Sequence, residues 1–122
     1  FVSLQHGDVA AEIDAVNATL ARPLRRFEPA ELDEFESLAG LVRALDVIVS
    51  VQTALVHLAG AVGTPCLAMI PFFPEWRYGQ GVSTMPWYGG VELFRQPRHG
   101  AWPPILAAIG AALDRRGRLT SN

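Results

Sequence analysis

The chain has 122 residues, half of them hydrophobic, and a formal net charge of −2. This length supports one compact domain over residues 1–122, and the charge provides no overall field to attract nucleic acid or an anionic membrane. The longest apolar stretch, Ala54–Ala61, is interrupted by His57 and falls short of the ~18 residues of a transmembrane segment. The single cysteine, Cys66, excludes an internal disulfide. It favours a reducing compartment, so we expect a cytoplasmic location.

The first third of the chain predicts two strands and two helices. Phe1–Gln5 reads as a strand, and Val9–Leu20 has apolar residues at helical spacing after a candidate N-cap at Asp8. Leu24–Phe27 predicts a short second strand. The stretch Pro29–Leu45 predicts one helix, because proline and acidic residues open it and an apolar stripe runs through it.

The rest of the chain predicts three strands and two helices. The strands are Val47–Val51, whose β-branched run is typical of burial on both faces, Cys66–Ile70 and Val91–Phe94. The helices are Ala54–Val62, which is apolar almost all round, and one that opens at Pro103 and ends before Gly117. This alternation indicates an α/β fold with a parallel sheet and helices on both faces.

The turn between the strand Val47–Val51 and the following helix is a candidate phosphate site. Ligands of such sheets bind beyond the carboxyl ends of the strands, close to helix N-termini. Thr53 is a plausible N-cap, and the small Ala54 after it leaves the first amides of the helix accessible to a phosphate. Ser50 and Gln52 have side chains that form hydrogen bonds, and His57 lies one turn further along the same helical face.

The same residues have a purely structural interpretation. Thr53 is then only a helix cap, and His57 is a buried histidine bonded to a nearby carbonyl group. Every α/β protein has several such turns, and no glycine-rich nucleotide fingerprint is present. The residues alone leave both interpretations open.

The stretch Pro71–Gly90 has no periodic pattern and is longer than usual connections, which is typical of a lid or a binding loop. Flat aromatic faces suit a nucleobase or a sugar ring, and Arg77 suits a phosphate. A small second core or a partner surface is the alternative. The aromatic residues of this loop are Phe72, Phe73, Trp76, Tyr78, Trp87 and Tyr88.

Other chemistry-bearing residues give weaker signals. His6 and His99 have no ligand-type residue at metal spacing, so we expect surface histidines. Glu75 reads as a solvated loop residue and Cys66 as a small core residue. No P-loop, catalytic Ser-His-Asp order or metal motif is present in the sequence.

Five segments of the sequence resemble a known family. The segment Leu45–Pro65 closely resembles the signature of heptosyltransferase-like (family 9) glycosyltransferases. The blocks Pro71–Tyr78, Pro86–Tyr88 and Leu93–Gln96 are similar to a bacterial branch that joins such a domain to tetratricopeptide repeats, and Phe1–Gln5 is similar to its strand ending in Ser-Leu-Gln.

The resemblance implies a GT-B fold, with two Rossmann-like halves and an active site in the cleft between them. This chain is then most of the C-terminal half and a piece of a longer protein. The strand that precedes Phe1 in the C-terminal half is expected to be missing from it. The donor phosphates of a nucleotide-diphosphate sugar are expected at Ser50, Gln52, Thr53 and Ala54, beside His57. Pro71, Phe72, Trp76, Arg77, Trp87 and Tyr88 are expected near the cleft.

The resemblance also implies partners and chemistry. Transferases of this kind need no bound metal or cofactor, and helix amides stabilise the departing nucleoside diphosphate. The acceptor is unknown: a glycan, a lipid-linked sugar or a protein. The catalytic base is expected on the N-terminal half of the same protein, so this chain alone is not expected to turn over.

One residue departs from the family pattern. Gln52 stands where the family usually has aspartate, and an amide cannot serve as a base. Two further functions therefore stay open beside the transferase: a non-catalytic binding or scaffold module, and a different nucleotide-binding enzyme with the same fold. The missing glycine fingerprint argues against a dinucleotide oxidoreductase.

Overall fold

The computed structural model describes the backbone of residues 1–120 and the side chains of residues 1–117. The chain divides into two compact units, which we call unit 1 (Phe1–Leu41) and unit 2 (from Val42 onward). Each unit is described by itself. The expectation of one domain over residues 1–122 stays a prediction.

Unit 1 alternates short strands with helices. Its elements are β1 (Val2–Ser3), α1 (Ala10–Asn17), β2 (Arg25–Arg26), α2 (Pro29–Asp33) and most of α3 (Phe35–Ala44). The two strands pair in parallel. The Asn17 amide joins the end of α1 to β2, because it accepts a hydrogen bond from the Leu24 N–H (2.7 Å) and donates one to the Leu24 carbonyl (3.3 Å). The N-cap of α1 is Val9 rather than the expected Asp8, and no side chain caps it.

The prediction of a single helix over Pro29–Leu45 is wrong. Glu34 has an extended backbone (φ −83°, ψ 118°) and separates α2 from α3. The sequence carries two helix-start signals here, one at the beginning of that stretch and one within it. Glu28 and Glu31 form a capping box at the start of α2. Glu34 then accepts a hydrogen bond from the Ser37 hydroxyl at 2.6 Å, in the first turn of α3.

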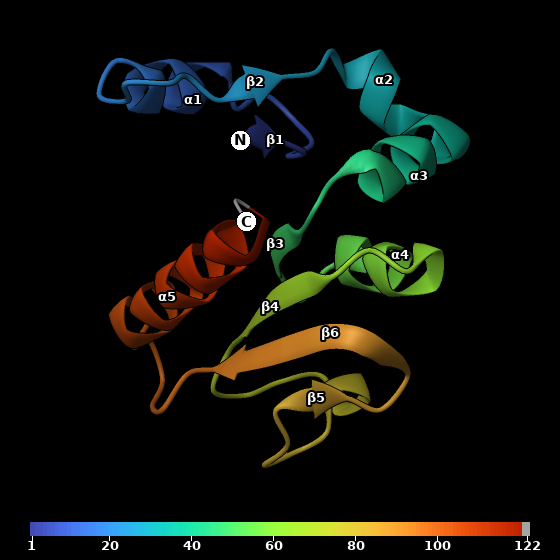
Figure 1. The fold of residues 1–122 in the computed structure, drawn as a ribbon, viewed down its shortest axis with the longest axis vertical. Helices are drawn as coiled ribbons and strands as arrows, with labels where there is room; N and C mark the ends of the chain where they lie inside the picture. Colours follow the sequence, from blue (N-terminus) through green and yellow to red (C-terminus); the bar gives the residue numbers. More distant parts are fainter. Residues whose placement is uncertain (121–122) are drawn as a thin grey trace. The chain divides into compact units, whose positions relative to one another are not determined.

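Unit 2 contains a four-stranded sheet in the order β3-β4-β6-β5. Its elements after α3 are β3 (Ile48–Val51), α4 (Ala54–Val62), β4 (Cys66–Ile70), the 3₁₀ turn η1 (Trp76–Tyr78), β5 (Thr84–Met85), β6 (Tyr88–Arg95) and α5 (Pro103–Thr120). β3, β4 and β6 are parallel, and the short edge strand β5 is antiparallel to β6. Figure 1 shows α4 and α5 on opposite sides of this sheet. The predicted parallel α/β class is confirmed.

The two faces of the sheet have separate packing. Leu67 of β4 packs with Ile105, Ile109 and Ala112 of α5. Because side chains alternate along a strand, Cys66, Ala68 and Ile70 face the other side, where α4 contacts β3, β4 and β6. The edge strand β3 buries only one face, since Val49 and Val51 are exposed; the expectation that this strand is buried on both faces is wrong.

Two further boundaries differ from the prediction. The stretch Pro71–Gly90 is not without structure: it contains η1 and β5, and β6 begins at Tyr88. The last helix does not end before Gly117 but runs through it to Thr120. A single glycine weakens a helix without stopping it.

Candidate functional site at the β3–α4 turn

The turn from β3 to α4 consists of Gln52 and Thr53 and lies at the carboxyl end of a parallel strand. Thr53 is the N-cap of α4 by its extended backbone (φ −131°, ψ 175°), as predicted. Its side chain makes no capping hydrogen bond. Its carbonyl accepts the Val56 N–H at 3.1 Å. The amides of Ala54 and Leu55, at the positive end of the helix dipole, are therefore not capped by the Thr53 side chain.

Ser50 supports this turn from within the strand. The residue is buried, and its hydroxyl lies 3.1 Å from the Thr53 hydroxyl and donates to the Val51 carbonyl at 2.9 Å. These contacts hold the Thr53 side chain back toward β3. Ser50 thus shapes the turn without lining the hollow in front of it.

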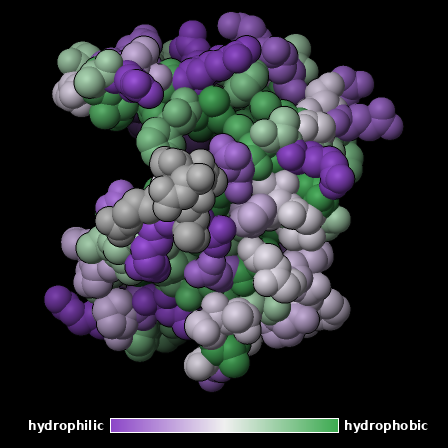
Figure 2. All heavy atoms as spheres, in the orientation of Figure 1, coloured by the Kyte–Doolittle hydropathy of each residue, from purple (hydrophilic) through white to green (hydrophobic). Residues whose placement is uncertain are grey.

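An open hollow of about 550 Å³ lies in front of the turn. In Figure 2 the part of unit 2 around α4 and η1 shows white and pale purple residues with green ones among them, so this face is neither strongly polar nor uniformly hydrophobic. Of the residues expected at the site, the structure brings together Gln52, Thr53, Ala54, His57, Trp76, Arg77, Trp87 and Tyr88. It leaves Ser50, Pro71 and Phe72 outside, and it adds Glu75 and Tyr78.

Aromatic rings form one wall of the hollow. The His57 ring lies between those of Tyr78 and Tyr88, with centroids 5.9 Å from each. Trp76 and Trp87 are largely exposed, at 73% and 61%. This wall combines buried and solvent-exposed rings, and the exposed indole rings can stack on a planar or sugar-like ligand.

Gly60 of α4 makes room for the Tyr88 ring. A β-carbon at Gly60 would lie 2.3 Å from Cγ of Tyr88, closer than any non-bonded approach. Sequence reasoning missed this residue. The available signal was a glycine inside an otherwise strong helix, where it costs stability unless something packs against it.

The charged residues of the hollow are already paired with each other. The Arg77 guanidinium donates to the Glu75 carboxylate at 2.9 Å and lies over the Trp76 ring, 5.1 Å from its centroid. Arg77 therefore lines the hollow beside the turn and has a protein carboxylate as its partner. Glu75 is exposed, as predicted, yet it lines the hollow.

Residues at the end of β6 hold the loop that carries these groups. Arg95 donates from Nε to the Val82 carbonyl at 2.8 Å and from a terminal nitrogen to the Tyr78 carbonyl. Gln96 is buried, and its Oε1 accepts the N–H groups of Phe72 (3.0 Å) and Gly100 (3.3 Å). The loop is thus anchored at three points along the chain.

Burial changes the acid–base properties behind the hollow. Desolvation and then the nearby Glu75 charge raise the pKa of the Tyr78 hydroxyl above its usual value. Desolvation lowers the pKa of Arg95 and raises the pKa of the Cys66 thiol to about 12. Cys66 is fully buried, in agreement with its predicted role as a core residue.

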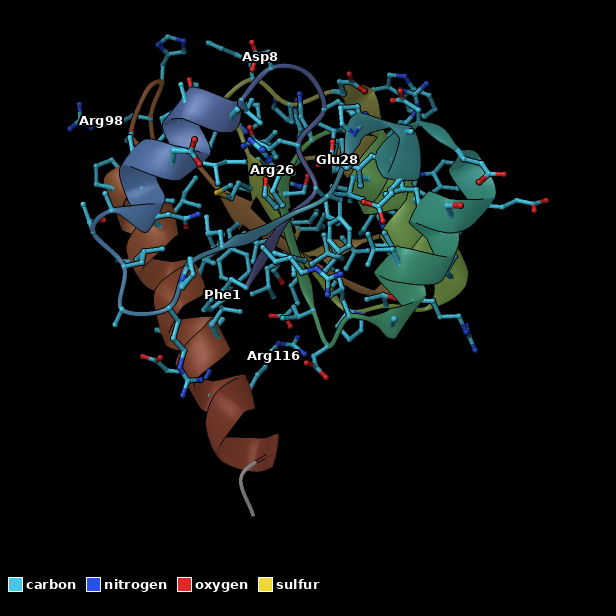
Figure 3. All side chains as sticks on the ribbon, turned by 90° about the horizontal axis from the view of Figure 1, so that it is seen from above. Phe1, Asp8, Arg26, Glu28, Arg98 and Arg116 are labelled. Atoms are coloured by element: carbon cyan, nitrogen blue, oxygen red, sulfur yellow. The ribbon has the colours of Figure 1, made fainter. Side chains whose placement is uncertain are left out.

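Unit 1 has a hollow of its own, of about 350 Å³, at the carboxyl ends of β1 and β2. Figure 3 labels Asp8 before α1 and Arg26 and Glu28 around the end of β2, three residues of its lining. His6 also lines it, 3.6 Å from an Asp33 oxygen. The sequence pattern gave no signal for this hollow, because its residues come from two separate strand ends.

The described part of the chain has neither a cluster of metal-ligand residues nor a membrane-spanning helix. Among its side chains, no group of three His, Cys, Asp or Glu residues could hold a metal ion. None of its helices is both long and apolar enough to cross a membrane.

Two curated proteins are similar in sequence. The chain is 32% identical to "Protein FlbA" of Caulobacter vibrioides over 114 residues, which are 93% of this chain and 19% of that protein. It is 37% identical to "Putative lipopolysaccharide heptosyltransferase 4" of Escherichia coli over 68 residues, 56% of this chain and 18% of that protein. The chain thus spans about a fifth of the length of the curated relatives it matches. No family model and no solved structure matches.

The second similarity gives part of the chain a glycosyltransferase-like relationship. This agrees with the predicted class at its coarsest level and with the α/β sheet of unit 2. Neither name refers to tetratricopeptide repeats, so the repeat-fused branch stays a prediction.

Proposed function

We propose that this chain is the donor-binding part of a glycosyltransferase that moves a sugar from a nucleotide-diphosphate sugar to an acceptor. The observation that carries the proposal is the hollow at the β3–α4 turn, where an uncapped helix start meets a wall of exposed indole rings. The partial similarity to the Escherichia coli relative supports the same class.

The donor would use the two kinds of surface in different ways. Its phosphates would lie at the first turn of α4, where the amides of Ala54 and Leu55 and the helix dipole favour negative charge. Its base or sugar would stack on Trp76 or Trp87. Arg77 would exchange its bond to Glu75 for one to a phosphate. The same donors would stabilise the departing nucleoside diphosphate without a metal.

The rest of the reaction would lie outside this chain. The hollow contains no carboxylate at position 52, and Glu75 is paired with Arg77. We therefore place the catalytic base on an N-terminal GT-B half of the same protein. The acceptor, the fusion to tetratricopeptide repeats and a cytoplasmic location belong to the same proposal.

One observation favours a second function. Gln52 stands where heptosyltransferase-like glycosyltransferases usually have aspartate. The fold can therefore persist as a binding or scaffold module that transfers no sugar. The transferase and the binding module would bind the same nucleotide-sugar, and only the transferase would transfer its sugar to an acceptor.

Titration of the folded protein with UDP- and ADP-sugars, followed by assay of sugar transfer and donor hydrolysis, separates the two. The transferase predicts saturable binding by this chain and turnover by the longer protein that contains both halves. Binding without any turnover by that longer protein would favour the scaffold. Absence of binding to every donor would contradict both.

A further inference from the structure

Gln52 connects two segments that are far apart in the chain. Its Oε1 accepts a hydrogen bond from the backbone N–H of Glu75 at 3.3 Å. Gln52 belongs to the β3–α4 turn, and Glu75 is the residue before η1. Both residues line the same hollow. This bond therefore joins the turn directly to the loop that carries Trp76 and Arg77.

The bond uses the backbone of Glu75 and leaves its side chain for another partner. The Glu75 carboxylate is paired with Arg77, and Arg77 lies against the Trp76 ring. A change in the position of the Glu75 backbone would thus move the carboxylate, the guanidinium and the indole together. The three groups form one cluster whose link to the turn is Gln52.

The bond also fixes what the Gln52 side chain offers to a ligand. An amide has one oxygen that accepts and one nitrogen that donates two hydrogen bonds. Since Oε1 is occupied by the Glu75 N–H, Nε2 is the end of the amide that remains for a group in the hollow. A carboxylate at this position could accept the same N–H, but it would have no donor.

We propose that Gln52 is a positioning residue that latches the Glu75–Tyr78 loop to the β3–α4 turn and presents Nε2 as a donor to a phosphate in the hollow. The latch concerns the protein without ligand. The donor role rests on the proposed function.

The latch is tested by two variants of Gln52 that differ in the acceptor. Gln52→Leu removes it, and Gln52→Glu keeps it at similar length. The readout is residue-resolved hydrogen exchange of the Tyr78 and Gly79 amides, which close the η1 turn on Glu75 and Trp76. Gln52→Leu should raise their exchange rates by about 2- to 10-fold, the usual contribution of one hydrogen bond. Gln52→Glu should leave them near the wild-type rates.

A matched pair at position 75 tests whether the Glu75 N–H is the partner. The φ of Glu75 (−63°) is the one that proline requires, so Glu75→Pro removes the N–H at a compatible φ, while Glu75→Ala keeps it. Both remove the carboxylate. Gln52→Leu should change the exchange rates in the Glu75→Ala background and have no further effect in Glu75→Pro. Equal effects in the two backgrounds, or a Gln52→Glu variant that behaves like Gln52→Leu, would overturn the latch.

The donor role is tested with inorganic pyrophosphate as the probe. Gln52→Glu keeps the latch but replaces the donor by a charge of the wrong sign, so its affinity for pyrophosphate should fall about tenfold or more. Equal affinity of the variant and the wild type would overturn the donor role. If the wild type itself fails to bind, the donor role falls together with the proposed function, and the exchange experiment still decides the latch.

Discussion

At the scale of single residues, Gly60 determines where the Tyr88 ring can lie. The ring occupies the space of a missing methyl group, since an added β-carbon would come within 2.3 Å of it. Gly60→Ala should therefore destabilise the protein by about 1–3 kcal/mol, the usual cost of overpacking, although alanine is the better helix former. Urea unfolding measures this change.

A second helical glycine provides the control. Gly110 of α5 has open space around its α-carbon. Gly110→Ala should raise the free energy of unfolding by about 0.5–1 kcal/mol. The explanation for Gly60 fails if the two substitutions change stability in the same direction.

Cys66 gives the stability of the protein a dependence on alkaline pH. Burial raises the pKa of its thiol from 9.0 to about 12, so the folded state retains a proton that the unfolded state loses. Its contribution to stability is complete below pH 9 and is lost between pH 9 and 12, by about 1.4 kcal/mol per pH unit. Unfolding curves should show this loss, and the slope should be shallower in Cys66→Ala. Identical slopes in the wild type and in Cys66→Ala would contradict this role of Cys66. Tyr78, whose pKa is also raised, contributes to the pH dependence that remains in Cys66→Ala.

At the scale of elements, the sequence predicted strongly patterned segments well. The ranges Ala54–Val62 and Cys66–Ile70 agree with α4 and β4. Local competition caused the errors: Glu34 starts a new helix inside an apolar stripe, and β6 begins three residues before its buried part at Val91. Hydrophobic periodicity indicates which residues face a core. It carries no information on where hydrogen bonds interrupt a helix or extend a strand.

Arg95 holds the connection between β4 and β6, whose only helical element is the short 3₁₀ turn η1. Its bonds to the carbonyls of Val82 and Tyr78 tie the loop to the end of β6. Arg95→Met keeps the apolar stem and removes these donors. It should lower stability by about 1–3 kcal/mol and accelerate hydrogen exchange in residues 78–85.

Arg98 is the matched control for Arg95. It is exposed in the loop before α5 and extends away from the protein in Figure 3. Arg98→Met should leave both stability and exchange unchanged. A comparable effect of the two substitutions would mean that general charge, and not the two carbonyl bonds, supports the loop.

At the scale of the whole molecule, the two units have unequal cores. In unit 1, Ile13 and Leu32 are the buried hydrophobic residues among those described, whereas the buried core of unit 2 extends from Val42 to Ala112. Unit 1 should therefore unfold at lower urea concentration and exchange its amides faster. Residue-resolved exchange at several urea concentrations measures this. A single transition shared by α1 and β4 would contradict it.

The site could be predicted only in part at this scale. The turn with Thr53 was predictable because strand ends and helix starts follow from pattern. The positions of Trp76, Arg77 and Tyr88 around it were not, because long-range contacts such as the one between Gln52 and Glu75 leave no periodic signal. The resemblance named these loop residues, and the fold brings them to the turn.

The central claim, a phosphate-binding turn at the start of α4, is tested most directly by calorimetric titration of a Thr53→Glu and a Thr53→Ser variant with the nucleotide-sugar that the wild type binds best. Thr53 is exposed and makes no capping bond, so the loss of its contact with the Ser50 hydroxyl in Thr53→Glu should be offset by the favourable position of the new charge next to a helix N-terminus. We predict that Thr53→Glu weakens donor binding at least about tenfold while Thr53→Ser binds like the wild type. Equal donor affinity in the folded Thr53→Glu variant would contradict the claim.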